Sequence, residues 1–266
     1  MRLFRGHAHS RFLWLAALLG LAGLTRAHAG ETGGARPVFT EDMTPYQIYM
    51  VSENYIAPSG SREYVTTQER NTVSRSKDGT SSHKLEVRTV DRENWKDGFF
   101  VAWQHETVET FQSDGKTEVR EEASYLVDGW VYKRNGDRKI KYLREPSPHE
   151  GVGVVEGYHG IYFAENMVAS QSRHGNRLRF TLNPEAINEY NREIGYTEEM
   201  VSAAVEVELD DEGEVKKITH RSVGVQSDGT VRSESTASFV LETTQAGNVT
   251  PVFPPDLNSY AEIENR

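Results

Sequence analysis

The chain has 266 residues, a formal net charge of −10 and no cysteine. The absence of cysteine excludes disulfide bonds, thiol catalysis and cysteine-based zinc sites. The first 29 residues contain four arginines and no acidic residue, so without them 26 basic residues stand against 40 acidic ones, a net charge of −14. Such acidity argues against nucleic acid and anionic membrane surfaces as partners.

The N-terminus is typical of a cleavable export signal. Three arginines precede an apolar stretch from Phe12 to Leu24, and Ala27 and Ala29 provide the small residues that a signal peptidase reads before Gly30. Thirteen apolar residues are fewer than the roughly 20 that span a bilayer, which disfavours a transmembrane anchor. No cysteine follows for lipid attachment. The sequence therefore predicts a signal peptide over residues 1–29 and a secreted or periplasmic protein with no stable membrane anchor.

Residues 30–43 are predicted to form a flexible leader, and residues 44–266 a single domain. Thr44, Pro45 and Gln47 form a capping box with proline at the first helical position, so a helix is expected to begin here. Its apolar side would carry Tyr46, Tyr49, Met50 and Tyr55, and Pro58 with Gly60 would end it.

A second helix is predicted from Asn183 to Ile194. Asn183 is the N-cap, Pro184 takes the first helical position and Gly195 the position after the last turn. Its apolar stripe consists of Ala186, Ile187, Tyr190 and Ile194.

Most of the remaining chain alternates polar and apolar residues with a period of two, as in strands that are wet on one face. Aspartate or asparagine before glycine marks tight hairpin turns, because these residues accept positive φ. Six such turns occur, at 77–79, 113–115, 128–129, 135–136, 211–213 and 227–229. The clearest strand is Val201–Leu209, and residues 146–160, rich in proline and glycine, are expected to form a long loop or flap. The fold class is therefore mainly β, with a curved antiparallel sheet and two or three short helices.

The sequence contains no recognisable catalytic motif. A nucleophile elbow, a P-loop, a dinucleotide-binding motif and H-E-x-x-H are all absent. The six histidines after residue 29 show no metal-ligand spacing, and the acidic runs fall at turns and strand edges, where solvated charge is usual. We expect no catalytic residue, no metal and no cofactor. A hydrolase that uses His149 or His159 is the open alternative.

Aromatic residues gather in the middle third of the chain. Either they fill an ordinary sheet core, or they line an apolar groove on the concave face that the helices cover. The candidate ligand-binding residues are Trp103, Phe111, Tyr125, Trp130, Tyr132, Phe163, Phe180 and Phe239.

Three segments carry a resemblance to a known family. They are the strand, turn and aromatic strand at 125–132, the strand leading into a helix at 180–186, and the hairpin at 205–218 with the closing residues 252–255. In these the chain resembles the LolA/LppX-like half-barrel superfamily of bacterial envelope proteins. The resemblance implies a curved antiparallel sheet around helices, an apolar cavity that holds acyl chains in several relatives, and no catalytic residues.

Together these features predict a non-enzymatic binding or carrier protein for a lipid or other apolar ligand in the bacterial cell envelope. The alternative is a protein-interaction or envelope-sensing module with a solid core and no small ligand.

Overall fold

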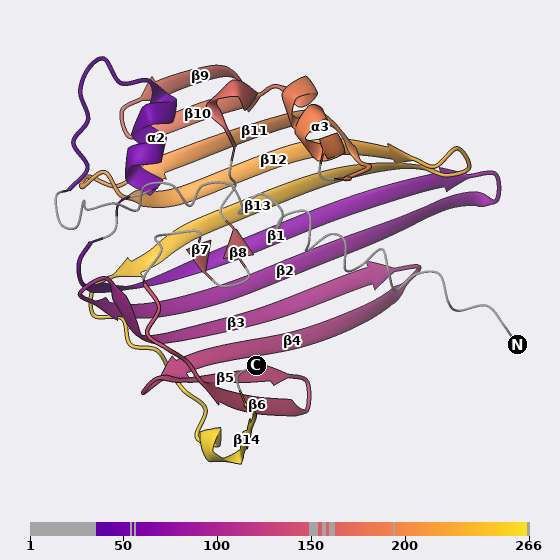
Figure 1. The fold of residues 1–266 in the computed structure, drawn as a ribbon. Coiled ribbons are helices and arrows are strands. Elements are labelled where there is room, and N and C mark those ends of the chain that lie inside the picture. Colours follow the sequence, from indigo (N-terminus) through magenta and orange to yellow (C-terminus); the bar gives the residue numbers. More distant parts are fainter. Residues whose placement is uncertain are drawn as a thin grey trace, which may run out of the picture.

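The structure, a computed structural model, describes residues 36–53, 55, 57–148, 154–155, 158–159, 163–193 and 195–264. The predicted export signal and Ile194 lie outside these residues. The described part is dominated by one curved sheet of twelve strands (Figure 1).

The strand order places the N-terminal strand near the centre of the sheet. From β1 the chain runs outward through successive hairpins: β1 (Gly60–Ser76), β2 (Gly79–Lys96), β3 (Phe99–Ser113), β4 (Lys116–Val127), β5 (Trp130–Asn135) and β6 (Arg138–Leu143). It then returns inward from the opposite edge: β9 (Val168–His174), β10 (Arg177–Leu182), β11 (Glu199–Leu209), β12 (Val215–Ser227) and β13 (Arg232–Ala246). Antiparallel pairing of β1 with β13 joins the two halves.

The sheet is open, because its two edges are different strands. One edge is β9; the other is the short β14 (Ala261–Glu262), which pairs parallel with β6. A separate pair consists of β7 (Val154–Val155) and β8 (Tyr158–His159), within the segment predicted as a loop. The prediction of a mainly β fold with a curved sheet is confirmed, and every strand pair of the sheet except β14 with β6 is antiparallel.

Both predicted helices are present, on the same face of the sheet over its β9–β12 end (Figure 1). Helix α2 (Pro45–Glu53) has the expected capping box: the Gln47 amide donates to Thr44 Oγ1 at 3.2 Å, and the Thr44 amide donates to Gln47 Oε1 at 2.9 Å. It ends before Tyr55. Helix α3 (Pro184–Glu193) is capped by Asn183, whose Oδ1 accepts from the Glu185 amide at 3.0 Å. Short 3₁₀ helices lie before β9, at η2 (Glu165–Met167), and after β13, at η3 (Leu257–Ser259).

The turn chemistry explains the hairpins. Asp114 and Gly115 both have positive φ, as do Asp128 and Gly129, which fits tight two-residue turns. A seventh such pair, Asp97 and Gly98 between β2 and β3, has the same geometry and was not among the predicted turns.

Segments at both ends of the domain lie against the sheet. Within the predicted leader, Arg36 pairs with Glu212 at 2.7 Å and Phe39 packs against the core. After β13, the chain crosses to β6: the Val252 amide donates to Gln104 Oε1 at 2.7 Å, and the Ile263 amide donates to the Lys141 carbonyl at 2.9 Å.

Candidate functional site

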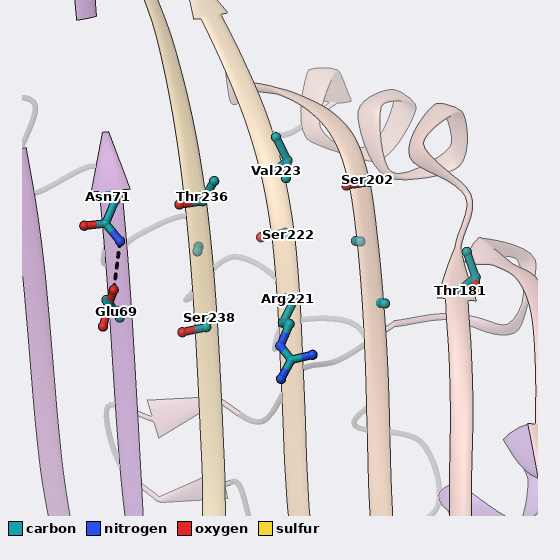
Figure 2. A pocket seen from close by; sticks show the side chains of 12 residues that line it. Glu69, Asn71, Thr181, Ser202, Arg221, Ser222, Val223, Thr236 and Ser238 are labelled. Carbon is teal, nitrogen blue, oxygen red and sulfur yellow. Dashed lines mark hydrogen bonds between the residues drawn. The ribbon is translucent and has the colours of Figure 1, made fainter. Parts of the chain in front are cut away.

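A hollow of about 460 Å³ lies on the sheet face opposite the helices (Figure 2). Small polar side chains such as Ser202, Thr236 and Ser238 line it, together with Arg221. None of the eight predicted binding residues is among its lining residues. This hollow is therefore distinct from the apolar groove that the sequence predicts.

The register assigns each predicted binding residue to a face, because directly paired residues on antiparallel strands point to the same side. We call the face covered by α2 and α3 the inner face. Five predicted residues lie on it or pack against it: Trp103, Phe111, Phe163, Phe180 and Phe239.

The remaining three, Tyr125, Trp130 and Tyr132, point to the outer face. Tyr125 pairs with Tyr132, whereas its neighbour Leu126 pairs with Trp103. The C-terminal segment covers two of these rings, through Tyr125 against Phe253 at 6.2 Å and Tyr132 against Tyr260 at 5.5 Å. The structure thus divides the predicted set between the two opposite faces of the sheet.

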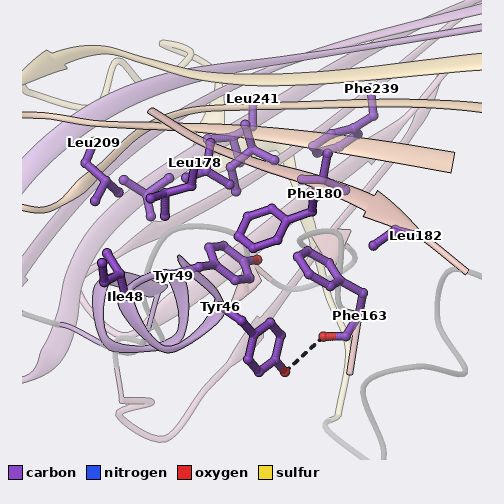
Figure 3. Packing of buried hydrophobic residues seen from close by; sticks show 14 of the residues in the cluster. Tyr46, Ile48, Tyr49, Phe163, Leu178, Phe180, Leu182, Leu209, Phe239 and Leu241 are labelled. Carbon is purple, nitrogen blue, oxygen red and sulfur yellow. Dashed lines mark hydrogen bonds between the residues drawn. The ribbon is translucent and has the colours of Figure 1, made fainter. Parts of the chain in front are cut away.

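On the inner face, aromatic rings from α2, β10 and β13 and the ring of Phe163 pack into one cluster (Figure 3). Tyr49 of α2 stacks on Phe163 with 5.4 Å between ring centroids, and Phe163 lies 5.0 Å from Phe180. Tyr46 donates a hydrogen bond to the Phe163 carbonyl at 3.1 Å. The nine-residue helix α2 and Phe163 therefore cover this part of the inner face, together with Met167 and with Ile187 and Tyr190 of α3.

Two predicted residues stand apart from this cluster. Trp103 packs with Leu126 and Val131 in a smaller group near β4 and β5. Phe111 stacks on His83 with a centroid distance of 6.0 Å. Both share the inner face with Phe180 but belong to different strands and different packing groups.

A buried polar row, absent from the sequence prediction, crosses the inner face beside the apolar cluster. Arg62 of β1 donates to Glu93 of β2 at 3.0 Å, and the Tyr64 hydroxyl donates to the same carboxylate at 3.1 Å. Glu93 is 1% exposed. The signal in the sequence is spacing: Arg62 and Tyr64 are two residues apart in β1, and Glu93 and Trp95 are two residues apart in β2. Residues two apart on a strand lie on the same face, so charged and aromatic side chains share one face here.

The next pair in the row is Asp91 with His105, joined at 2.6 Å between Oδ1 and Nδ1. Burial raises the pKa of Asp91, against the opposing effect of His105. Burial lowers the pKa of His105, but the hydrogen bond and charge of Asp91 outweigh it and the net pKa is raised. Each group therefore favours the charged form of the other, although for Asp91 the effect of burial is the larger one.

Glu53, in the last turn of α2, is the most perturbed carboxyl group here. Burial raises its pKa to about 7, although the charge of Arg62 and a hydrogen bond from Tyr49 act in the opposite direction. Because its pKa in the folded chain exceeds the value of 4.5 expected for a free glutamate, Glu53 favours folding most below pH 4.5 and loses this contribution as the pH rises to about 7.

The variant Glu53→Gln tests this shift, because glutamine cannot ionise. Its free energy of unfolding should exceed that of the parent chain by about 1–3 kcal/mol at pH 8, with little difference at pH 4. Urea denaturation at a series of pH values measures the difference. A difference that does not change with pH would contradict the raised pKa.

His220 lies in the apolar part of the inner face, between Phe239 and Val205 in the register. Burial lowers its pKa to about 4, so the imidazole is neutral at physiological pH. A neutral imidazole is compatible with the apolar surroundings.

A second polar network holds Glu198 against the inner face. Its carboxylate accepts from Arg70 Nη2 at 2.9 Å, from the Tyr196 hydroxyl at 2.7 Å and from Ser235. Gly224 leaves the space that this carboxylate occupies, since a Cβ at position 224 would lie 2.5 Å from Glu198 Oε1.

Gly224→Ala should therefore lower the free energy of unfolding by about 1–3 kcal/mol through overpacking. The measurement is urea denaturation of Gly224→Ala in the parent chain and in a Glu198→Ala background. The loss should be much smaller in the second case, where the carboxylate is gone. An equal loss in both backgrounds would show that the contact with Glu198 is not the cause.

The described residues contain no group of three or more histidine, aspartate or glutamate side chains arranged to hold a metal ion. In the same ranges, no helix is both long and apolar enough to cross a bilayer.

Comparison with known proteins gives no family assignment. No protein-family model and no curated protein matches the chain. Among solved structures, it is similar to the MucA/MucB complex of Pseudomonas aeruginosa, with 8% identity, 67% of this chain and 88% of that chain covered, and a TM-score of 0.13. At this TM-score the match supports no inference about function.

Proposed function

We propose that the chain is a non-enzymatic binding or carrier protein that takes up a lipid or other apolar ligand on the inner face of an open half-barrel sheet. The observation that carries the proposal is that Tyr49 of α2 and Phe163, which both come from outside the sheet, lie against Phe180 at the apolar end of that face. Tyr49 and Phe163 stack on each other above Phe180, so a movement of α2 away from the sheet would uncover part of the buried apolar side chains of the sheet.

Different elements cover different parts of the sheet. Within the described residues, the principal helix contacts are those of α2 with β9 and β10 and of α3 with β11 and η2. A sheet face with apolar side chains is stable only when another layer or a ligand covers it. An acyl chain that replaces the rings of Tyr49 and Phe163 would preserve that cover.

The export signal supports the location in this proposal. Residues 1–29 carry the features that direct a chain out of the cytoplasm, and no cysteine follows for lipid attachment. We therefore place the carrier, after cleavage before Gly30, in the periplasm or outside the cell.

Titration of residues 30–266 with a fluorescent fatty acid tests the proposal. We expect saturable binding near one probe per chain. Tyr49→Ala should tighten binding several-fold, because it removes a ring from the space that the ligand would occupy. Tyr132→Ala, which removes a tyrosine ring from the outer face, is the matched control and should leave the affinity unchanged. No saturable signal with any of the three proteins would overturn the proposal.

A second function is favoured by the packing of the same rings. Centroid distances of 5.0–6.0 Å among Tyr46, Tyr49, Phe163 and Phe180 are those of a filled core. On this alternative the chain is a protein-interaction or envelope-sensing module without a small ligand. Native mass spectrometry of the chain purified from its own cells separates the two functions: a bound lipid mass supports the carrier, and one stoichiometric protein partner without lipid supports the module.

A further inference from the structure

The hollow on the outer face is built by the register of five strands. One row of directly paired residues crosses it from β10 to β1 and consists of Thr181, Ala204, Arg221, Ser238 and Glu69. The adjacent row on the same face consists of Ser202, Val223, Thr236 and Asn71. Figure 2 shows these side chains on one side of the sheet, with α3 behind it.

Side-chain size explains why the surface is hollowed here. The two rows carry mostly alanine, serine and threonine, whereas the rows on either side carry longer side chains. On one side these include Arg179 and Glu206, and on the other Glu199 and Glu234. The resulting volume of about 460 Å³ falls in the range of small-molecule sites.

Arg221 differs from the other basic residues on this face of β10 and β12. Arg177, Arg179 and Lys217 each face a carboxylate on the neighbouring strand, at 3.5, 3.0 and 2.8 Å. The residues paired with Arg221 are Ala204 and Ser238, and no ion pair joins Arg221 to any other described residue. Its guanidinium therefore faces a hollow lined with hydroxyl groups. There it can form bidentate hydrogen bonds to a carboxylate or phosphate.

The opposite end of the row has the reverse polarity. Glu69 lies two strands from Arg221, about 10 Å away by the usual strand spacing. Its carboxylate accepts from Asn71 at 2.8 Å and lies 3.6 Å from Lys84, an exposed pair. A ligand across the rows would meet a cation at one end, a hydrogen-bond acceptor at the other, and serine and threonine hydroxyls between them.

We propose that this hollow binds a small, hydroxyl-rich ligand with one carboxylate or phosphate group, that is, an acidic sugar. The acid group binds Arg221, and the sugar hydroxyls exchange hydrogen bonds with Ser202, Thr236, Ser238 and Glu69. The site lies on the face opposite the proposed apolar site, so a negative result for one site leaves the proposal for the other unchanged.

The test is a series of ¹H–¹⁵N NMR titrations of residues 30–266 with glucuronate, glucose 6-phosphate, glucose and inorganic phosphate. At least one of the two acidic sugars should produce saturable shifts at the amides of Ser202, Arg221, Thr236 and Ser238. Which of them binds more tightly distinguishes a carboxylate from a phosphate ligand. Glucose and inorganic phosphate, each lacking half of the recognised chemistry, should bind at least tenfold more weakly.

Arg221→Gln should weaken binding of the acidic sugar about tenfold or more, because it removes a charge-assisted hydrogen bond. Arg232→Gln is the matched control, since Arg232 is exposed on the same face of β13 outside the hollow, and it should leave binding unchanged. The proposal would be overturned by the absence of saturable shifts with both acidic sugars, by equal affinity for inorganic phosphate, or by unchanged affinity in Arg221→Gln.

Discussion

Replacing Glu93 with alanine is expected to lower the free energy of unfolding by about 3–5 kcal/mol, the usual cost of removing one partner of a buried ion pair. The side chains of Arg62 and Glu93 are 8% and 1% exposed, and the Tyr64 hydroxyl donates to the same carboxylate. The variant therefore leaves a buried guanidinium without the carboxylate to which it donates, and a buried phenol without its acceptor. Urea denaturation measures the loss.

Two controls separate this effect from a general loss of charge. Glu118→Ala breaks an ion pair of similar length, 2.8 Å to Arg120, but both side chains are about half exposed, so the change should stay within about 1 kcal/mol. Arg62→Met combined with Glu93→Leu removes both charges and should recover most of the stability lost in Glu93→Ala. Equal effects of Glu93→Ala and Glu118→Ala would contradict the buried polar row.

Phe180→Ala is the second variant with a large expected effect, a loss of about 3–5 kcal/mol. Phe180 is 2% exposed and contacts Phe163 and Tyr49, which come from segments outside the sheet. The cavity left by the ring would therefore loosen the contacts that hold α2 and Phe163 against the sheet. Thermal or urea unfolding measures the loss.

Phe99→Ala serves as the comparison, because Phe99 is 48% exposed and should change the free energy of unfolding by no more than about 0.5 kcal/mol. If Phe180→Ala cost as little as Phe99→Ala, the aromatic cluster would not be the core that holds α2 on the sheet.

Local chemistry allowed the elements of the fold to be predicted. Thr44 with Gln47, and Asn183 with Pro184, define helix starts through bonds that each residue makes with its near neighbours. The aspartate–glycine and asparagine–glycine pairs define hairpins because they take up positive φ. These signals depend on only a few consecutive residues, so they can be recognised in the sequence.

The arrangement of the halves depends on contacts between distant residues. Thr66 pairs with Leu241 at the seam between β1 and β13, and nothing in either strand indicates the other as its partner. The pattern of alternation was also insufficient to assign faces across strands. Tyr125 and Tyr132 alternate as regularly as Phe180 does, yet the register places them on the outer face, where the C-terminal segment covers them.

The burial of the polar residues on the inner face could not be predicted from the sequence. Arg62, Asp91 and Glu93 look like solvated positions in the sequence, since charged side chains are rarely buried unless paired. Their partners lie on adjacent strands, so burial becomes apparent only once the register is known. The outer hollow likewise arises from small residues on five strands that the register brings into two rows.

Binding of an apolar ligand on the inner face is tested most directly by intermolecular NOEs between a fatty acid and residues 30–266. The carrier proposal predicts NOEs from acyl-chain protons to Leu178, Phe180 and Leu241, which line the apolar end of that face. It also predicts none to Tyr132 or Tyr260 on the outer face. NOEs confined to the outer face, or no NOEs with a saturating fatty acid, would contradict it.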